Sequence, residues 1–135
     1  MQPSPSTAIL NPGLFDFAAR PETISWRFFQ PGVEIHRLFG PGQSGASAAL
    51  LRFQPGGRVP LHHHSGHEYI LVLAGSQTDE NGDASAGTLI VNPPGTQHSI
   101  VSHTGCVVLA IYEKPVAFLA DAPAPVEVAP AAPAP

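Results

Sequence analysis

The chain has 135 residues and a formal net charge of -4; 43% of its residues are hydrophobic and 12% are charged. This length suits one domain with a core large enough to fold alone. Lys and Arg form no cluster, which argues against a nucleic-acid partner. No apolar stretch reaches the roughly 20 residues needed to span a bilayer, so no membrane segment is expected.

The two ends of the chain differ in composition from its middle. Residues 1–23 start Pro-rich, lack the positive start and apolar run of a secretory signal, and are predicted to form an N-terminal arm. Residues 120–135 contain seven Ala and five Pro, so a disordered, extended tail is predicted there. The one cysteine, Cys106, excludes an intramolecular disulfide. Together with the missing signal, it favours a cytoplasmic protein.

Short segments with strand character fill the middle of the chain, and Gly or Pro closes each of them. Asn81-Gly82 predicts a tight hairpin within the acidic stretch 79–83, which lacks the length and closing Glu of a calcium loop. A short helical turn is expected at 113–120. Many short strands at regular spacing indicate an antiparallel sandwich or barrel. The predicted strands include 24–29, 33–39, 47–53, 68–73, 88–91 and 106–112.

Four possible metal ligands lie in two short stretches of the chain. Residues two apart on a strand face the same way, about 6.6 Å apart, so His62 and His64 share a face and His63 points to the other. Glu68 follows after a short loop, and His98 arrives from a separate strand. Three imidazoles and a carboxylate suit Zn, Fe(II), Mn, Ni or Cu(II) better than Ca or Mg. Imidazole binds metal only when neutral, so affinity is expected to fall as the pH drops through roughly 6.

The sequence leaves the coordination of this metal open. A six-coordinate ion with four protein ligands keeps positions for water or substrate. A tetrahedral zinc ion bound by all four would be closed and structural.

Five further side chains have reactive groups. His67 is either an acid/base or hydrogen-bonding group near the site or a polar loop residue. Tyr69 offers a phenol to a ligand or packs in the core. His36 is expected to be structural, and His103 exposed. Cys106, in an apolar run, is expected to be a buried packing residue.

Two segments resemble the conserved motifs of the cupin superfamily. Gly56 to Gly75 reads G-x5-H-x-H-x3-E-x6-G, and Gly87 to His98 reads G-x5-P-x-G-x2-H. The resemblance implies an all-β, double-stranded β-helix (jelly-roll barrel) over residues 24–119, and homodimers formed through N-terminal strands. It also implies a divalent metal, with Zn, Fe(II) and Mn as candidates. The implied ligands are His62, His64, Glu68 and His98.

Within this superfamily the chain is similar to the ChrR-like cupin domain over about residues 24–112. The similarity rests on segments such as Trp26-Arg27-Phe28-Phe29, Pro55-Gly56-Gly57 and Asn92-Pro93-Pro94-Gly95. Nothing in the sequence resembles the zinc-binding anti-sigma module that precedes this domain in some family members. The chain reads Gly66-His67-Glu68-Tyr69 where the family usually has Gly-Gly-Glu-Glu, and Ser102 where cupins usually have Asn.

Two functions follow from the resemblance. The first is a metalloenzyme of dioxygenase-like or isomerase-like type that acts on a small organic molecule. Its catalytic residues are open, with Glu68, His67 and Tyr69 as candidates. The second is a non-catalytic metal, ligand or redox sensor with a regulatory role. A purely structural metal is a third reading.

Overall fold

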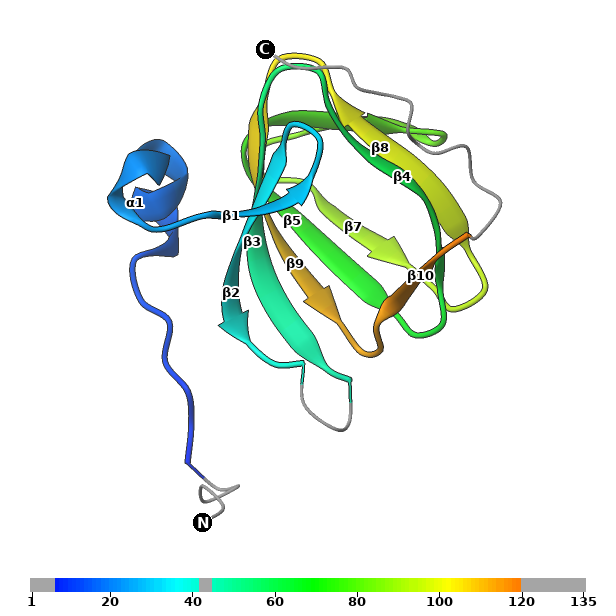
Figure 1. Ribbon diagram of the computed structural model, residues 1–135, viewed down its shortest axis with the longest axis horizontal. Helices are drawn as coiled ribbons and strands as arrows, with labels where there is room; N and C mark the ends of the chain where they lie inside the picture. The colour runs from blue at the N-terminus through cyan, green and yellow to red at the C-terminus, as the bar shows by residue number, and fades with distance from the viewer. Residues whose placement is uncertain (1–6, 42–44, 120–135) are drawn as a thin grey trace.

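The computed structural model describes residues 7–41 and 45–119. These residues contain ten β-strands, one α-helix and one 3-10 helix (Figure 1). The N-terminal segment carries α1 (Leu14–Ala19) and η1 (Pro21–Thr23). The predicted tail, 120–135, lies outside the described residues, as do residues 1–6 of the predicted arm. The strands are β1 (Arg27–Gln30), β2 (Val33–Phe39), β3 (Ser47–Phe53), β4 (Gly57–His64), β5 (Glu68–Asp79), β6 (Gly82–Ser85), β7 (Leu89–Asn92), β8 (Gln97–Ser102), β9 (Cys106–Tyr112) and β10 (Val116–Phe118).

The strands pair antiparallel in one curled sheet, in the order β1-β2-β3-β9-β5-β8-β4-β10, with β6 and β7 also paired to β5. The long strand β5 joins the two halves of the barrel: its first part pairs with β7 and β9, and its last part with β6 and β8. Gly75 marks the change, with φ +76°, and a Cβ there would clash with the carbonyl oxygen of Gly105. Only glycine suits such a position. The predicted all-β barrel is confirmed.

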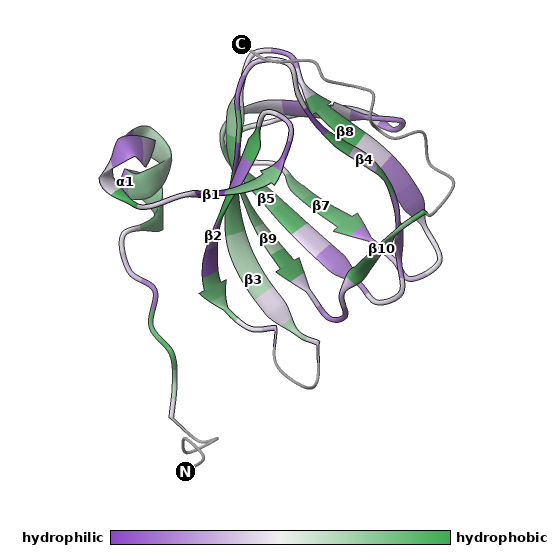
Figure 2. Cartoon of the chain, viewed as in Figure 1, coloured by the Kyte–Doolittle hydropathy of each residue, from purple (hydrophilic) through white to green (hydrophobic). Residues whose placement is uncertain are grey.

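The core consists of side chains that alternate inward along the strands. Figure 2 shows hydrophobic residues (green) along β7 and β9 and hydrophilic ones (purple) toward one end of β5. Each fully buried aliphatic side chain contributes about 1.5–3 kcal/mol of transfer free energy, so this cluster stabilises the frame around the polar end. Its largest buried members are Val33, Ile35, Leu51, Phe53, Val59, Ile70, Val72, Ile100 and Val108.

The end of the N-terminal arm lies against the face of β2 and β3 that points away from the core. Trp26 donates its indole N–H to the carbonyl of Pro21 (2.7 Å), and the Arg52 guanidinium lies 5.0 Å from the Trp26 ring centre. His36 Nδ1 is 2.8 Å from the carbonyl oxygen of Ser25. The structural role expected for His36 is therefore confirmed. Within the described ranges, no helix is long and apolar enough to cross a membrane.

The helical turn expected at 113–120 is wrong. Val116–Phe118 form β10, which pairs antiparallel with β4, so that Val116 lies opposite His64 and Phe118 opposite His62. Pro115 disfavours helical geometry in the residue before it, and the edge of β4 offers unpaired backbone groups that a β-branched and aromatic segment satisfies.

The hairpin predicted near Asn81-Gly82 is present, but its turn is one residue earlier. Asp79 pairs with Gly82, so the loop residues are Glu80 and Asn81. Asp79 Oδ1 accepts a hydrogen bond from the backbone N–H of Asn81 (2.8 Å), which closes the turn.

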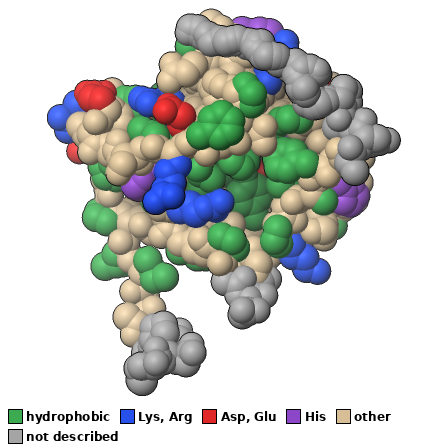
Figure 3. Space-filling model, viewed as in Figure 1, with side chains coloured by type: hydrophobic (Ala, Val, Ile, Leu, Met, Phe, Trp, Pro, Cys, Tyr) green, Lys and Arg blue, Asp and Glu red, His purple; other side chains and the backbone are tan. Residues whose placement is uncertain are grey.

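The space-filling view looks toward an open end of the barrel, where hydrophobic side chains line a hollow (Figure 3).

Candidate metal centre

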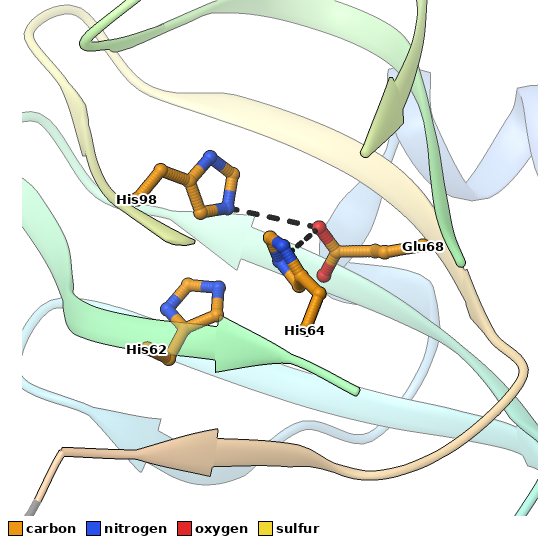
Figure 4. A group of neighbouring side chains, drawn as sticks. All are labelled: His62, His64, Glu68 and His98. Atoms are coloured by element: carbon orange, nitrogen blue, oxygen red, sulfur yellow. Dashed lines mark ion pairs between the residues drawn. The ribbon is translucent and has the colours of Figure 1, made fainter. Parts of the chain in front are cut away.

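Four side chains from three strands converge inside the barrel (Figure 4). His62 and His64 come from β4, Glu68 from the first residue of β5, and His98 from β8. Each is at most 2% exposed. One ligand atom from each lies within 4.8 Å of the other three. The structure thus brings together all four residues predicted to bind the metal.

The register of the sheet explains this convergence. β4 and β8 pair so that His62 lies directly opposite His98, and their ring centres are 4.7 Å apart. Alternation along β4 places His64 on the same face, with its ring centre 5.0 Å from that of His62 and 4.8 Å from that of His98. All three imidazoles therefore line one side of the interior and face Glu68.

In two of the histidines, Nδ1, the ring nitrogen that faces away from the cavity, contacts a group that can only accept a hydrogen bond. His62 Nδ1 lies 2.8 Å from the carbonyl oxygen of Pro60, and His98 Nδ1 lies 2.8 Å from Asp79 Oδ2. Both Nδ1 atoms must therefore carry the proton. In the neutral rings, the Nε2 lone pairs then point into the cavity.

His64 has the same arrangement through a hydroxyl group. Its Nδ1 lies 3.0 Å from Thr96 Oγ1, and the Thr96 hydroxyl already donates to the carbonyl of Pro93 (2.7 Å). The Thr96 oxygen therefore accepts from His64. Partners of this kind set the tautomer of metal-binding histidines.

The Nε2 atoms of His64 and His98 face a further hydrogen-bond acceptor, the carboxylate of Glu68. His64 Nε2 is 3.0 Å and His98 Nε2 is 3.7 Å from Glu68 Oε1, yet neither nitrogen has a hydrogen-bond partner among the described residues. Two lone pairs facing a carboxylate in a buried site repel unless a proton or metal cation lies between them. Neutral imidazoles and a carboxylate are a borderline donor set that suits a divalent transition metal. The buried group therefore fits a divalent metal site.

The ionisation states also favour metal binding. Burial lowers the pKa of His62 to about 4, so this ring is neutral at pH 7. Burial raises the pKa of Glu68, but a hydrogen bond and positive charge from a protonated His64 and, after it, positive charge at His62 and His98 lower it more strongly, and the net direction is down. A metal cation in place of these protons acts in the same direction. Metal binding requires a neutral imidazole and an ionised carboxylate.

Two further groups hold Glu68 in place. Asn92 donates its side-chain N–H to Glu68 Oε1 (2.9 Å), within the barrel. The phenol of Tyr112 is close enough that, after burial itself, the charge of Glu68 is the main cause of the raised pKa of Tyr112. Glu68 is thus oriented by a neutral donor and flanked by a phenol that stays protonated.

The Asp79→Asn variant is expected to bind zinc about 10–100-fold more weakly than the parent protein, since losing the carboxylate that orients a metal-binding histidine typically costs that much. The measurement is competition with a chromogenic chelator. Asp83→Asn is the matched control, because Asp83 lies in the same hairpin and bonds to Thr78, away from the four-residue group. Equal zinc affinity of parent and Asp79→Asn would contradict the assigned role.

Other sequence candidates lie outside the four-residue group. His67 Nδ1 is 3.0 Å from Glu113 Oε1, and its side chain is 40% exposed. Tyr69 stacks on His67, with ring planes 4° apart. His103 is exposed and Cys106 is buried, as expected. Burial raises the pKa of Cys106 to about 11, which agrees with a packing role.

Sequence reasoning missed the residues that support the ligands. Asp79 lies in the segment interpreted only as a turn, and Asn92 lies in the quoted Asn92-Pro93-Pro94-Gly95 segment. Both residues were therefore visible in the sequence, but the ligands that they contact, His98 and Glu68, are 19 and 24 residues away. Tyr112 ends a strand that was expected to be apolar.

Gln77 is a further polar residue that the sequence did not single out. It is 1% exposed, and neither its amide nitrogen nor its oxygen has a hydrogen-bond partner within the described part of the chain. It lines an inner cavity with His62 and Glu68, and this cavity, of about 10 Å³, has room for about one water molecule. An unpaired buried amide costs about 1–3 kcal/mol. Gln77 therefore presents a donor and an acceptor to whatever occupies this cavity.

The sequence profile of the ChrR Cupin-like domain matches residues 15–117. The anti-sigma-E factor ChrR of Cereibacter sphaeroides is 34% identical over 109 residues, which cover 78% of this chain and 50% of ChrR. The chain thus spans about half the length of that curated relative.

Solved structures show the same likeness. In the crystal structure of Rhodobacter sphaeroides SigE in complex with the anti-sigma ChrR, the similar chain has a TM-score of 0.63 and 33% identity, over 74% of this chain and 55% of that one. An acetylacetone dioxygenase from Acinetobacter johnsonii has a TM-score of 0.66 at 16% identity, over 71% of this chain and 72% of that one. At that identity the likeness is one of fold alone.

Proposed function

The chain belongs to the ChrR cupin-like domain family, and we propose that it holds a divalent transition metal at its four-residue group and there binds and converts a small organic molecule. The proposed ligands are His62, His64, Glu68 and His98, with Zn, Fe(II) and Mn as the candidate ions. The observation that carries the proposal is the meeting of buried imidazole lone pairs with an ionised carboxylate, with no hydrogen bond between them.

The metal would supply Lewis acidity toward carbonyl or enolate oxygens of the ligand. The chain itself keeps Glu68 ionised and holds three imidazoles in the metal-binding tautomer. Gln77 would bind a polar atom of the ligand. Of the three catalytic candidates, Glu68 alone lies in the four-residue group, so it is the proposed acid/base or ligand residue. The fold shared with an acetylacetone dioxygenase supports a dioxygenase-like or isomerase-like reaction.

A regulatory function is the second candidate. The relative with 34% identity is an anti-sigma factor, and the similar chain in the SigE–ChrR crystal structure belongs to a complex of a sigma factor with its anti-sigma factor. In this reading the metal centre senses a ligand or a redox change and a protein partner responds. The proposed setting for either function is a homodimer in the cytoplasm.

Elemental analysis of the untagged protein as purified is the first test. Bound iron or manganese favours the enzyme, and stoichiometric zinc favours the sensor. Protein loaded with Fe(II) is then supplied with β-diketones, hydroxyacetophenones and flavonols while O2 uptake is followed. Turnover of one class supports the enzyme. No O2 uptake with any class, together with recovery of a regulator in a complex with the protein, would replace it with the sensor.

A further inference from the structure

A second cavity lies outside the metal centre, at the open end of the barrel. Its volume is about 140 Å³, and its apolar lining includes Phe29, Ile35, Val116 and Phe118. Ligand sites for drug-sized molecules are typically about 300–1,000 Å³. This outer cavity therefore suits a much smaller organic molecule.

The outer cavity is adjacent to the inner one, which His62 and Glu68 line. Phe29, Tyr112, Val116 and Phe118 line both. The Phe118 ring centre is 5.6 Å from that of His62 and 6.3 Å from that of Phe29. A molecule in the outer cavity is thus separated from the metal ligands by a single layer of mostly aromatic side chains.

In the described part of the chain, Arg37 is the one charged residue that lines the outer cavity. Its neighbour Arg27 pairs with Ile35, which lines the same cavity, so cross-strand pairing places the Arg27 side chain on that face of the β1–β2 hairpin. Both arginines are exposed, and neither forms an ion pair within residues 7–41 and 45–119. Figure 3 shows Lys or Arg side chains (blue) beside the hollow with the hydrophobic floor.

A third arginine, Arg52, differs from Arg37 and Arg27 because it has an acidic partner. Arg52 is bound to Glu34, with 2.6 Å between Nη2 and Oε1, and so its charge is compensated. Among the residues that the structure describes, no Asp or Glu lines the outer cavity to compensate Arg37 in the same way. The uncompensated arginines would therefore attract an anion to this end of the barrel.

We propose that the outer cavity, with Arg37 and Arg27 at its rim, is the entry site for a small organic anion with an apolar body. The site deepens the proposed function, on which it rests, because it names the ligand class of the same metal centre. Guanidinium groups bind carboxylates through charge-assisted hydrogen bonds, while the aromatic layer contacts the apolar body. A hydrogen bond to a charged group contributes about 1.5–3 kcal/mol, so a tenfold or greater preference over a neutral analogue is expected.

The test compares benzoate with benzyl alcohol, which has a similar body but no charge. Titrations followed by NMR are run on the full chain, both zinc-loaded and zinc-free. Benzoate is expected to bind at least tenfold more tightly than benzyl alcohol in both forms. It should shift the side-chain signals of Arg37 and Phe118, and its affinity should fall at high salt.

Variants separate the entry site from capture of the carboxylate by the metal. Arg37→Gln, alone or with Arg27→Gln, is expected to remove the preference for benzoate. Arg58→Gln should leave it unchanged, because Arg58 is an exposed arginine on β4, which does not line the outer cavity. Equal affinities for the two probes, or a preference that needs zinc and survives Arg37→Gln, would overturn the proposal. A purified protein that contains no transition metal and does not bind zinc would instead count against the proposed function, while the zinc-free titration still decides the entry site.

Discussion

The double variant His62→Ala/His98→Ala is expected to lower the metal content of the purified protein from about one ion per chain to background, because two remaining ligands do not hold a transition metal in competition with water. The thermal stabilisation that metal gives should disappear with it. A ligand present at 100 times its Kd stabilises the folded state by about 2.7 kcal/mol. Elemental analysis and thermal unfolding, each with and without a chelator, measure both effects.

His63→Ala is the matched control for this experiment. His63 lies between His62 and His64 on β4 but is not part of the four-residue group. This variant is expected to keep the metal content and the chelator-sensitive stability of the parent protein. Circular dichroism shows whether the double variant is folded. A folded double variant that retains stoichiometric metal would refute the proposed ligand set.

Metal-free protein is expected to become less stable as the pH falls from about 6.5 to 4. The pKa of His62 is lowered from 6.5 to about 4 in the folded state, chiefly by burial. Between these values the unfolded chain binds a proton that the folded chain does not, so each pH unit costs about 1.4 kcal/mol. The loss amounts to about 3 kcal/mol, and above pH 6.5 this residue contributes no pH dependence. Glu68, with its lowered pKa, adds a loss in the same direction at still lower pH.

Urea unfolding of the chelator-treated protein at pH 7, 5.5 and 4 measures this effect. His62→Leu should remove most of the dependence between pH 6.5 and 4, whereas His103→Gln, at an exposed position, should leave it unchanged. A metal-free parent protein whose unfolding free energy is the same at pH 7 and pH 4 would contradict the burial of a neutral His62. Protons compete for His62 only near pH 4, so the fall in metal affinity expected near pH 6 would have to come from other ligands.

The four-residue group could be predicted because its geometry is partly local. His62 and His64 share a face of any strand, and motif spacing identified Glu68 and His98. The supporting contacts could not be predicted in this way. The bond between His98 and Asp79 depends on how β5 turns at Gly75 from one half of the barrel to the other. That turn is set by the packing of distant strands rather than by neighbouring residues.

The error at the C-terminal end has the same physical origin. The helical turn predicted at 113–120 rested on local preference alone, and the open edge of β4 favours the strand β10 there instead. Gln77 could not be predicted either, because nothing about a glutamine within a strand indicates that its amide is buried with no hydrogen-bond partner among the described residues.

The pairing of β10 with β4 has a practical consequence for the C-terminal end of the chain. Val116–Phe118 run alongside His62–His64, so the last described strand pairs directly with the strand that carries two of the proposed metal ligands. Tension or cleavage that detaches β10 would uncover the backbone of the histidine strand and remove the aromatic ring that contacts His62. Removal of β10 would therefore disturb the proposed metal centre, and metal measurements need this strand intact.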